Sequence, residues 1–190
     1  MHRVLRDPTG YLEKLAKPLR EKLRVAHYIP AHAKTALDVG CADGTVTIAL
    51  ANLLPKVQFL GIDLNADFIG RAIARAREQG VANARFEQIY LRDLLARPER
   101  FDAVSFVSVL HEFYAYGQGI SSVLKALGDA HELLRLNGEI VIRDMILFEY
   151  TKHTRFQVEA IAKKVFAQRA KRKYARDFEA RFGKLRSLYT

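Results

Sequence analysis

The chain has 190 residues, enough for one domain with a full hydrophobic core. Hydrophobic residues make up 49% of the sequence and charged residues 27%, which is the balance of a soluble globular protein. The longest apolar run, residues 103–110, is too short to span a bilayer, and the single cysteine excludes an intrachain disulfide. These features predict a cytoplasmic protein without a transmembrane segment.

The net charge of +10 is unevenly distributed along the chain. Residues 1–34 carry eight Lys and Arg against three acids, residues 35–150 carry eleven against fifteen, and residues 151–190 carry twelve against three. We expect a helical N-terminal flank (1–34), an α/β core (35–150) and a basic helical C-terminal segment (151–190). The basic flanks fit an anionic partner, with nucleic acid first and an anionic membrane surface second, or a solvated surface without a partner.

The predicted elements begin with two short helices over residues 7–28, where leucines recur at helical spacing and Pro18 starts the second helix. Apolar runs then predict five strands, at 35–39, 57–63, 84–89, 101–110 and 139–143. The segments between them predict helices from Thr45, over 66–79 and over 121–136, and a connector at 91–97. This alternation is typical of a doubly wound, parallel sheet. The predicted buried stripe of the helix at 66–79 consists of Phe68, Ile69, Ile73 and Ala76.

A glycine turn follows the first predicted strand. Gly40 and Gly44 bracket it, where glycine permits a positive φ and lets a ligand lie against the backbone. The helix that begins after the turn points its free N–H groups at whatever occupies the turn. Asp63 ends the second strand, 25 positions after Asp38, and an acid there can accept hydrogen bonds from the hydroxyls of a bound ribose. Ala42 breaks the G-x-G-x-x-G spacing of dinucleotide folds, which disfavours a nicotinamide cofactor.

Four segments in this order carry a family resemblance. They are LDVGCADG at 37–44, GID at 61–63, FDAV at 101–104 and LLRLNGEIVI at 133–142. Together they resemble class I S-adenosylmethionine-dependent methyltransferases, over about residues 35–144. The resemblance implies a Rossmann-like, mostly parallel sheet, S-adenosyl-L-methionine as cofactor and S-adenosyl-L-homocysteine as product. By position, Asp38 and Gly40 would serve the methionine end of the cofactor and Asp63 its ribose.

The resemblance also indicates how the rest of the cofactor is held. Tyr90 stands where the family often has an acid for the adenine amino group, so either Asp93 takes that role or Tyr90 packs on the adenine face. In this family a leading helical segment often forms a lid over the cofactor; here it either does so or only covers the sheet. The expected cofactor-binding residues are Asp38, Gly40, Cys41, Ala42, Gly44, Asp63, Leu64, Tyr90, Leu91, Asp93 and Ser108.

The segment LHEFYAYG at 110–117 follows the fourth predicted strand and would face the transferred methyl group. Methyl transfer is an in-line displacement that needs a base only when the acceptor must lose a proton. His111 is the predicted base, with Glu112 orienting it or binding an acceptor cation; alternatively His111 caps the strand or contacts the cofactor. The predicted acceptor contacts are Tyr114, Tyr116, Arg143 and, with them, Asp144.

Several chemistries are disfavoured. Methylation of a pyrimidine carbon needs a cysteine nucleophile, and Cys41 lies in the cofactor turn. The Asp/Asn-Pro-Pro-aromatic motif of amino-directed nucleic-acid methyltransferases does not follow the fourth strand, and no residue cluster indicates a metal site. We therefore predict methyl transfer to an oxygen or nitrogen atom, with a small molecule as the first hypothesis. RNA methylation through the basic flanks and a non-catalytic, cofactor-binding domain of a larger assembly are the alternatives.

The C-terminal segment departs from the expected family pattern. Apolar residues at helical spacing predict two amphipathic helices in 151–190 that carry many basic side chains. The fold of this family normally closes with a strand hairpin, and no convincing pair of strands follows Asp144. Either the hairpin is absent or the chain is a piece of a longer protein. A sheet of five strands leaves an edge that these helices or a partner chain must cover, so we expect a homo-oligomer or a longer chain.

Overall fold

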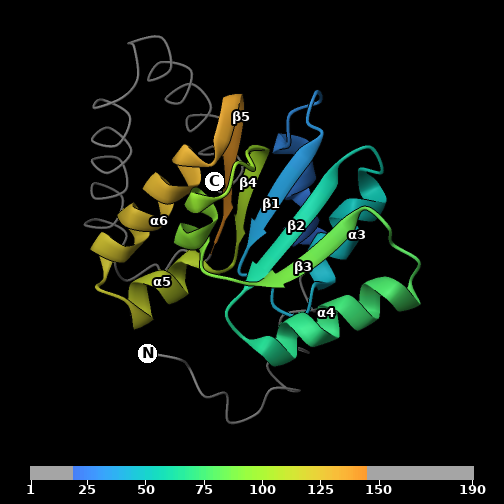
Figure 1. Cartoon of the computed structure of the whole chain (residues 1–190), viewed down its shortest axis with the longest axis horizontal. Coiled ribbons are helices and arrows are strands. Elements are labelled where there is room, and N and C mark those ends of the chain that lie inside the picture. The colour runs from blue at the N-terminus through green and yellow to red at the C-terminus, as the bar shows by residue number, and fades with distance from the viewer. Residues whose placement is uncertain (1–18, 145–190) are drawn as a thin grey trace. The chain divides into compact units, whose positions relative to one another are not determined.

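A five-stranded parallel sheet forms the centre of the described residues (Figure 1). The computed structural model describes residues 19–144. The sheet order is β3-β2-β1-β4-β5, and each neighbouring pair is parallel, as the sequence predicted. The strands are β1 (Thr35–Val39), β2 (Gln58–Asp63), β3 (Ala84–Gln88), β4 (Phe101–Val107) and β5 (Leu134–Arg143).

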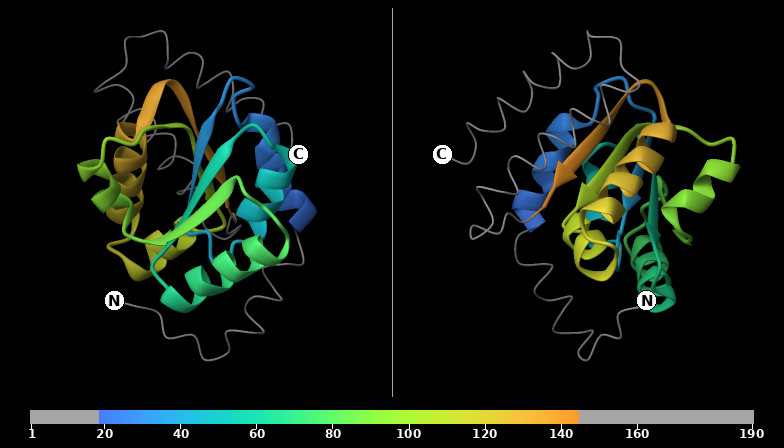
Figure 2. Two further views of the ribbon diagram at one scale, coloured as in Figure 1. Left: turned by 45° about the vertical axis from the view of Figure 1, so that its right-hand side comes forward. Right: turned by 90° about the vertical axis from the view of Figure 1, so that its left-hand side faces the viewer.

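Helices cover both faces of this sheet (Figure 2). The α-helices are α2 (Leu19–Lys22), α3 (Thr45–Leu53), α4 (Ala66–Glu78), α5 (Leu110–Tyr116) and α6 (Ile120–Glu132). Two 3₁₀ helices, η1 (Leu23–Tyr28) and η2 (Leu91–Ala96), complete the described elements. Strand alternation decides which face each residue serves, so that Leu37 packs with α6 and η2 while its neighbour Ala36 packs with η1 and α3. Among the described residues, no helix is long and apolar enough to cross a membrane.

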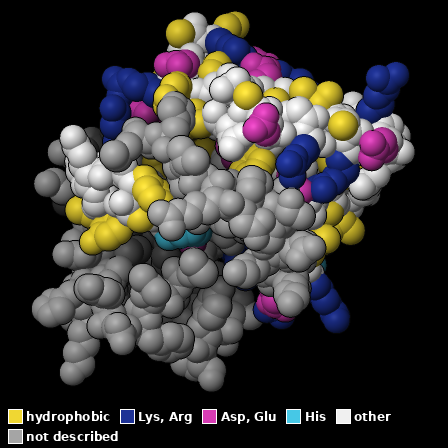
Figure 3. Space-filling model, turned by 90° about the horizontal axis from the view of Figure 1, so that it is seen from below, with side chains coloured by type: hydrophobic (Ala, Val, Ile, Leu, Met, Phe, Trp, Pro, Cys, Tyr) yellow, Lys and Arg dark blue, Asp and Glu magenta, His cyan; other side chains and the backbone are white. Residues whose placement is uncertain are grey.

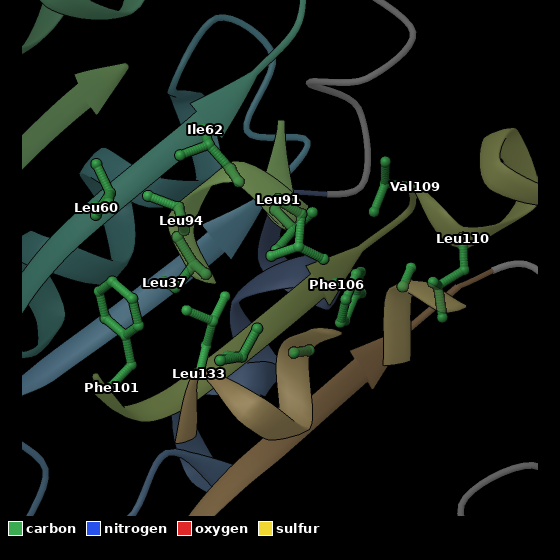
Figure 4. Packing of buried hydrophobic residues seen from close by; sticks show 14 residues of the cluster. Leu37, Leu60, Ile62, Leu91, Leu94, Phe101, Phe106, Val109, Leu110 and Leu133 are labelled. Carbon is green, nitrogen blue, oxygen red and sulfur yellow. The ribbon is translucent and has the colours of Figure 1, made fainter. Parts of the chain in front are cut away.

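The larger core cluster fills the space between the sheet, η2 and α6 (Figure 4). Leu37, Leu94 and Leu133 have no exposed surface, although they come from three distant parts of the sequence. Phe106 is also fully buried and meets Phe113 of α5 edge to face, with ring centroids 6.3 Å apart. β4 is buried at every position and is apolar except for Asp102 and Ser105, as expected of a central parallel strand.

Some predicted boundaries are wrong. The fourth strand ends at Val107 and not at Leu110, because Ser108 adopts a positive φ of 59° and turns the chain. Leu110 instead begins α5, so the predicted loop at 110–117 is mostly helix. The helix predicted to reach residue 136 ends at Glu132, and β5 starts five residues earlier than predicted, with an irregularity in its pairing with β4.

Smaller differences concern helices. The predicted connector at 91–97 contains η2. In α4, the sequence predicted a buried Ile73. The structure buries Ala72 instead and leaves Ile73 51% exposed, because Ile73 lies on a different side of the helix from Phe68. Three predictions fall outside the described residues. They concern the two helices in 151–190, the absence of a strand hairpin after Asp144 and the first of the two helices over 7–28.

We predict that Phe106→Ala lowers the free energy of unfolding by about 3–5 kcal/mol, since it removes a fully buried ring and leaves a cavity between β4 and α5. Chemical denaturation followed by circular dichroism measures the change. Leu136→Ala is the control, because this side chain is 85% exposed and its loss should cost less than about 0.5 kcal/mol. A loss of similar size in both variants would contradict the assigned packing.

Candidate active site

A cavity of about 670 Å³ opens at the carboxyl ends of β1, β2 and β4. The strand order reverses between β1 and β4, and ligands of open α/β sheets bind at such a reversal. Its walls come from the turns after these strands, from η2, from α5 and from the end of α2. The volume lies in the range of small-molecule sites.

The turn after β1 takes an unusual backbone path. Gly40, Ala42 and Gly44 all have a positive φ, of 71°, 48° and 74°. A Cβ atom at Gly40 would lie 2.3 Å from Val109 Cγ2, and one at Gly44 would lie 2.8 Å from Ala72 Cβ. Both glycines are therefore required by the turn conformation, as predicted, and the space left by their missing side chains is taken by the protein itself. Ala42 adopts the left-handed conformation at a cost of about 1 kcal/mol.

Asp63 fastens this turn to the end of β2. Its Oδ2 atom accepts a hydrogen bond from the Ala42 amide at 3.0 Å, and its Oδ1 atom accepts one from the Asn65 amide at 2.9 Å. Burial raises the pKa of the Asp63 carboxyl, although these backbone donors act in the opposite direction. Asp63 lines the cavity, and its contact with a bound ribose stays a prediction.

Asp38 and Lys22 place two opposite charges in one wall of the cavity. Asp38 is 2% exposed and accepts hydrogen bonds from Thr47 Oγ1 at 2.6 Å and Ser105 Oγ at 2.9 Å. Burial raises the pKa of Asp38 to about 6, although both hydroxyls lower it. Lys22 is 4% exposed, and burial lowers the pKa of its amine. Sequence reasoning missed Lys22 because α2 carries no motif.

The structure brings most of the other predicted cofactor residues to this cavity. Those that line it are Cys41, Leu64, Tyr90, Leu91 and Ser108. Asp93 lies on η2, where its amide donates to the Tyr90 carbonyl, and it is not among the described residues that line the cavity. Of the two predicted arrangements for adenine, the cavity thus presents Tyr90. In the described part of the chain, no group of acids, histidines or cysteines could hold a metal ion.

Helix α5 divides the predicted catalytic residues. Glu112 and Tyr116 line the cavity, and Phe113 lies between them in the same wall. His111 and Tyr114 are not among the lining residues that the structure describes. The ring of His111 pairs with Asp144 instead, with 2.7 Å between Nδ1 and Oδ1, and the His111 amide donates to Oδ2 at 3.2 Å. The sequence did not indicate this partner, which is 33 positions away.

Arg143 also forms a hydrogen bond with a residue of the site. Its guanidinium donates to Ser108 Oγ at 2.8 Å and so connects the end of β5 to the turn after β4. Ser108 itself lines the cavity, whereas Arg143 is absent from the described lining. A contact of Arg143 with the acceptor therefore stays a prediction.

Comparison with known proteins places these features in a family. The chain is 39% identical over 107 residues to the ubiquinone biosynthesis O-methyltransferase of Methylococcus capsulatus, covering 55% of this chain and 44% of that protein. It is 32% identical over 135 residues to the probable methyltransferase ltbC of Aspergillus luteorubrus, covering 67% and 46%. The chain thus spans less than half the length of these curated relatives.

The crystal structure of the plantazolicin methyltransferase BpumL shares the fold, with a TM-score of 0.63 and 14% identity over 86% of this chain and 70% of that one. The predicted Rossmann-like methyltransferase fold is thereby confirmed. A family model described as a methyltransferase domain matches residues 31–180, and the chain belongs to this family.

Proposed function

We propose that this protein transfers the methyl group of S-adenosyl-L-methionine to an oxygen or nitrogen atom of a small molecule. The observation that carries the proposal is one cavity lined both by Lys22, Asp38 and Asp63 (the charged end) and by Glu112 with aromatic residues of α5 (the α5 wall). Membership of a methyltransferase family and the likeness to an O-methyltransferase support it.

The residues of the charged end fit the cofactor. Asp38 and Lys22 offer an anion and a cation side by side, which matches the ammonium and carboxylate groups of the methionine part. Asp63 would accept hydrogen bonds from the ribose, and Tyr90 would cover the adenine. When bound, S-adenosylmethionine supplies a methyl group on a positively charged sulfur. Five of the described lining residues are acids and one is basic, so the cavity favours a cationic cofactor.

The α5 wall suits a small, flat acceptor. Phe113 and Tyr116 provide aromatic surface beside Glu112, whose carboxylate can accept a proton from an acceptor hydroxyl or amine. His111 is the other candidate base. It lies in the same first turn of α5 as Glu112, and its ring pairs with Asp144. Because the displacement is in line, the reaction needs no covalent intermediate with the protein. The site has only to hold the acceptor against the methyl group.

The surface of the described residues gives little support to RNA as the acceptor. Residues 19–144 carry fifteen basic and fifteen acidic side chains, so the excess of positive charge belongs to the remaining sequence. On the face shown in Figure 3, basic and acidic side chains of the described part are interspersed. The following experiment distinguishes methylation of a small molecule from methylation of RNA that binds through residues 151–190.

We predict that labelled methyl from S-adenosylmethionine enters the low-mass fraction when a metabolite extract and total RNA compete as acceptors. Glu112→Gln should lower kcat about 100-fold or more if Glu112 accepts the proton, and His111→Ala should do so if His111 does. Glu78→Gln is the matched control, because this carboxylate is exposed on α4 and is not among the residues that line the cavity. Label in RNA alone would overturn the small-molecule assignment, and cofactor binding without any transfer would overturn the enzymatic one.

We predict that Lys22→Met weakens binding of S-adenosylmethionine about tenfold or more, because a charged hydrogen bond to the methionine carboxylate is lost. Binding of 5′-methylthioadenosine, which lacks this carboxylate, should not weaken. Isothermal titration calorimetry measures both ligands. Arg24→Met is the control, since Arg24 pairs with Glu21 at the surface. Equal weakening of both ligands would refute the role assigned to Lys22.

The pKa of Asp38, about 6, predicts a pH dependence of cofactor binding. Above this pH the carboxylate is ionised and attracts the cofactor ammonium, whereas below it the carboxyl is neutral. Affinity for S-adenosylmethionine should therefore fall about tenfold between pH 7 and pH 5, where about one carboxyl in ten stays ionised. Asp38→Asn should bind more weakly at pH 7 and show a flatter profile. An equally steep profile in Asp38→Asn would assign the titration to another group.

A further inference from the structure

Arg75 of α4 contacts the cofactor turn from outside the cavity. Its Nη1 atom donates to the Asp43 carbonyl oxygen at 3.1 Å and to Asp43 Oδ2 at 2.5 Å, and it also meets Thr45 Oγ1. Arg75 is 32 positions from Asp43 in the sequence and is not among the residues that line the cofactor cavity. One side chain thus binds both the backbone and the carboxylate of the turn.

Asp43 connects the Arg75 contact to the start of α3. Its Oδ1 atom accepts hydrogen bonds from Thr45 Oγ1 at 2.8 Å and from the Thr45 amide at 3.3 Å. The Asp43 side chain is 9% exposed, whereas that of Arg75 is 34% exposed. Because a buried carboxylate depends on its cation, removal of Arg75 leaves Asp43 charged and unbalanced beside the cofactor site. The turn would then relax toward conformations that hydrate Asp43.

Two adjacent residues in the middle of the turn are held by side chains of the segment that runs from β2 into α4. Asp63 at the end of β2 holds Ala42, and Arg75 in the following helix α4 holds Asp43. Ala42 and Gly44 both need a positive φ, so the turn does not form on local preference alone. A free turn has more backbone conformations than the one that fits the cofactor, and binding must then order it.

We propose that Arg75 is a positioning residue for S-adenosylmethionine. It keeps the Gly40–Thr45 turn in the binding conformation without touching the cofactor, and this role rests on the proposed function. If only a fraction of molecules hold the turn ready, the apparent dissociation constant rises by the inverse of that fraction. Under the proposed function, methyl transfer takes place beside α5. Arg75 is not among the residues that line the cavity, so the chemical step should be unaffected.

The test measures S-adenosylmethionine binding by calorimetry and transfer kinetics for Arg75→Ala, Arg75→Lys and the control Arg71→Ala. Arg71 is an exposed arginine of the same helix. We expect Arg75→Ala to raise the dissociation constant about tenfold with kcat at saturating cofactor within about twofold of the wild type. Arg75→Lys should restore part of the affinity, because the ammonium keeps the charge but not both contacts. Arg71→Ala should bind as the wild type does.

Three results would overturn the role of Arg75. One is unchanged cofactor affinity in Arg75→Ala, and another is a lower kcat with unchanged affinity. The third is a lower unfolding temperature with unchanged affinity of the folded fraction, which would make the contact merely structural. If Arg75→Ala does not fold, Arg75→Lys carries the same comparison. Failure of the wild-type protein to bind S-adenosylmethionine would instead refute the proposed function.

Discussion

The hydrogen bond from the Ala42 amide to the Asp63 carboxylate is the contact on which the site depends. β1 and β2 are parallel neighbours, with Val39 opposite Ile62, so the turns that follow them start side by side. The amides of Gly40 and Cys41 both donate to the Ile62 carbonyl, at 2.8 and 2.9 Å, and bring the first turn against the second. The carboxylate of Asp63 then offsets the unfavourable φ of Ala42. The cofactor end of the cavity is therefore shaped by contacts within the chain.

Much of this arrangement could be predicted because its signals are local. Apolar runs and the glycine turn indicated β1, the start of α3 and the parallel sheet, and the acid that ends β2 was placed correctly. The end of β4 could not be predicted, since the apolar run continues through Leu110 and only the backbone of Ser108 breaks it. Lys22 and the His111–Asp144 pair were missed because burial and pairing across 33 positions arise from tertiary packing.

The cavity and the surface around it differ in charge. The described residues are neutral as a whole, yet five acids and one lysine line the cavity. The remaining described residues carry fourteen basic against ten acidic side chains, so the charge of the cavity is opposite to that of the residues around it. A cationic cofactor is therefore attracted at the site itself and not by the described surface. Methyl transfer from a cation to a neutral acceptor leaves a neutral thioether on the cofactor, which this cavity would hold less strongly than the charged one.

The cofactor turn contains one sulfur atom, that of Cys41, and its surroundings determine how readily oxidants react with it. Cys41 is 6% exposed, and burial raises the pKa of its thiol well above the ordinary value. Oxidants and alkylating agents react with the thiolate, so a thiol that stays protonated and enclosed reacts slowly. The chain thus carries its only cysteine in the wall of the cavity, where burial keeps the thiol protonated and slow to react.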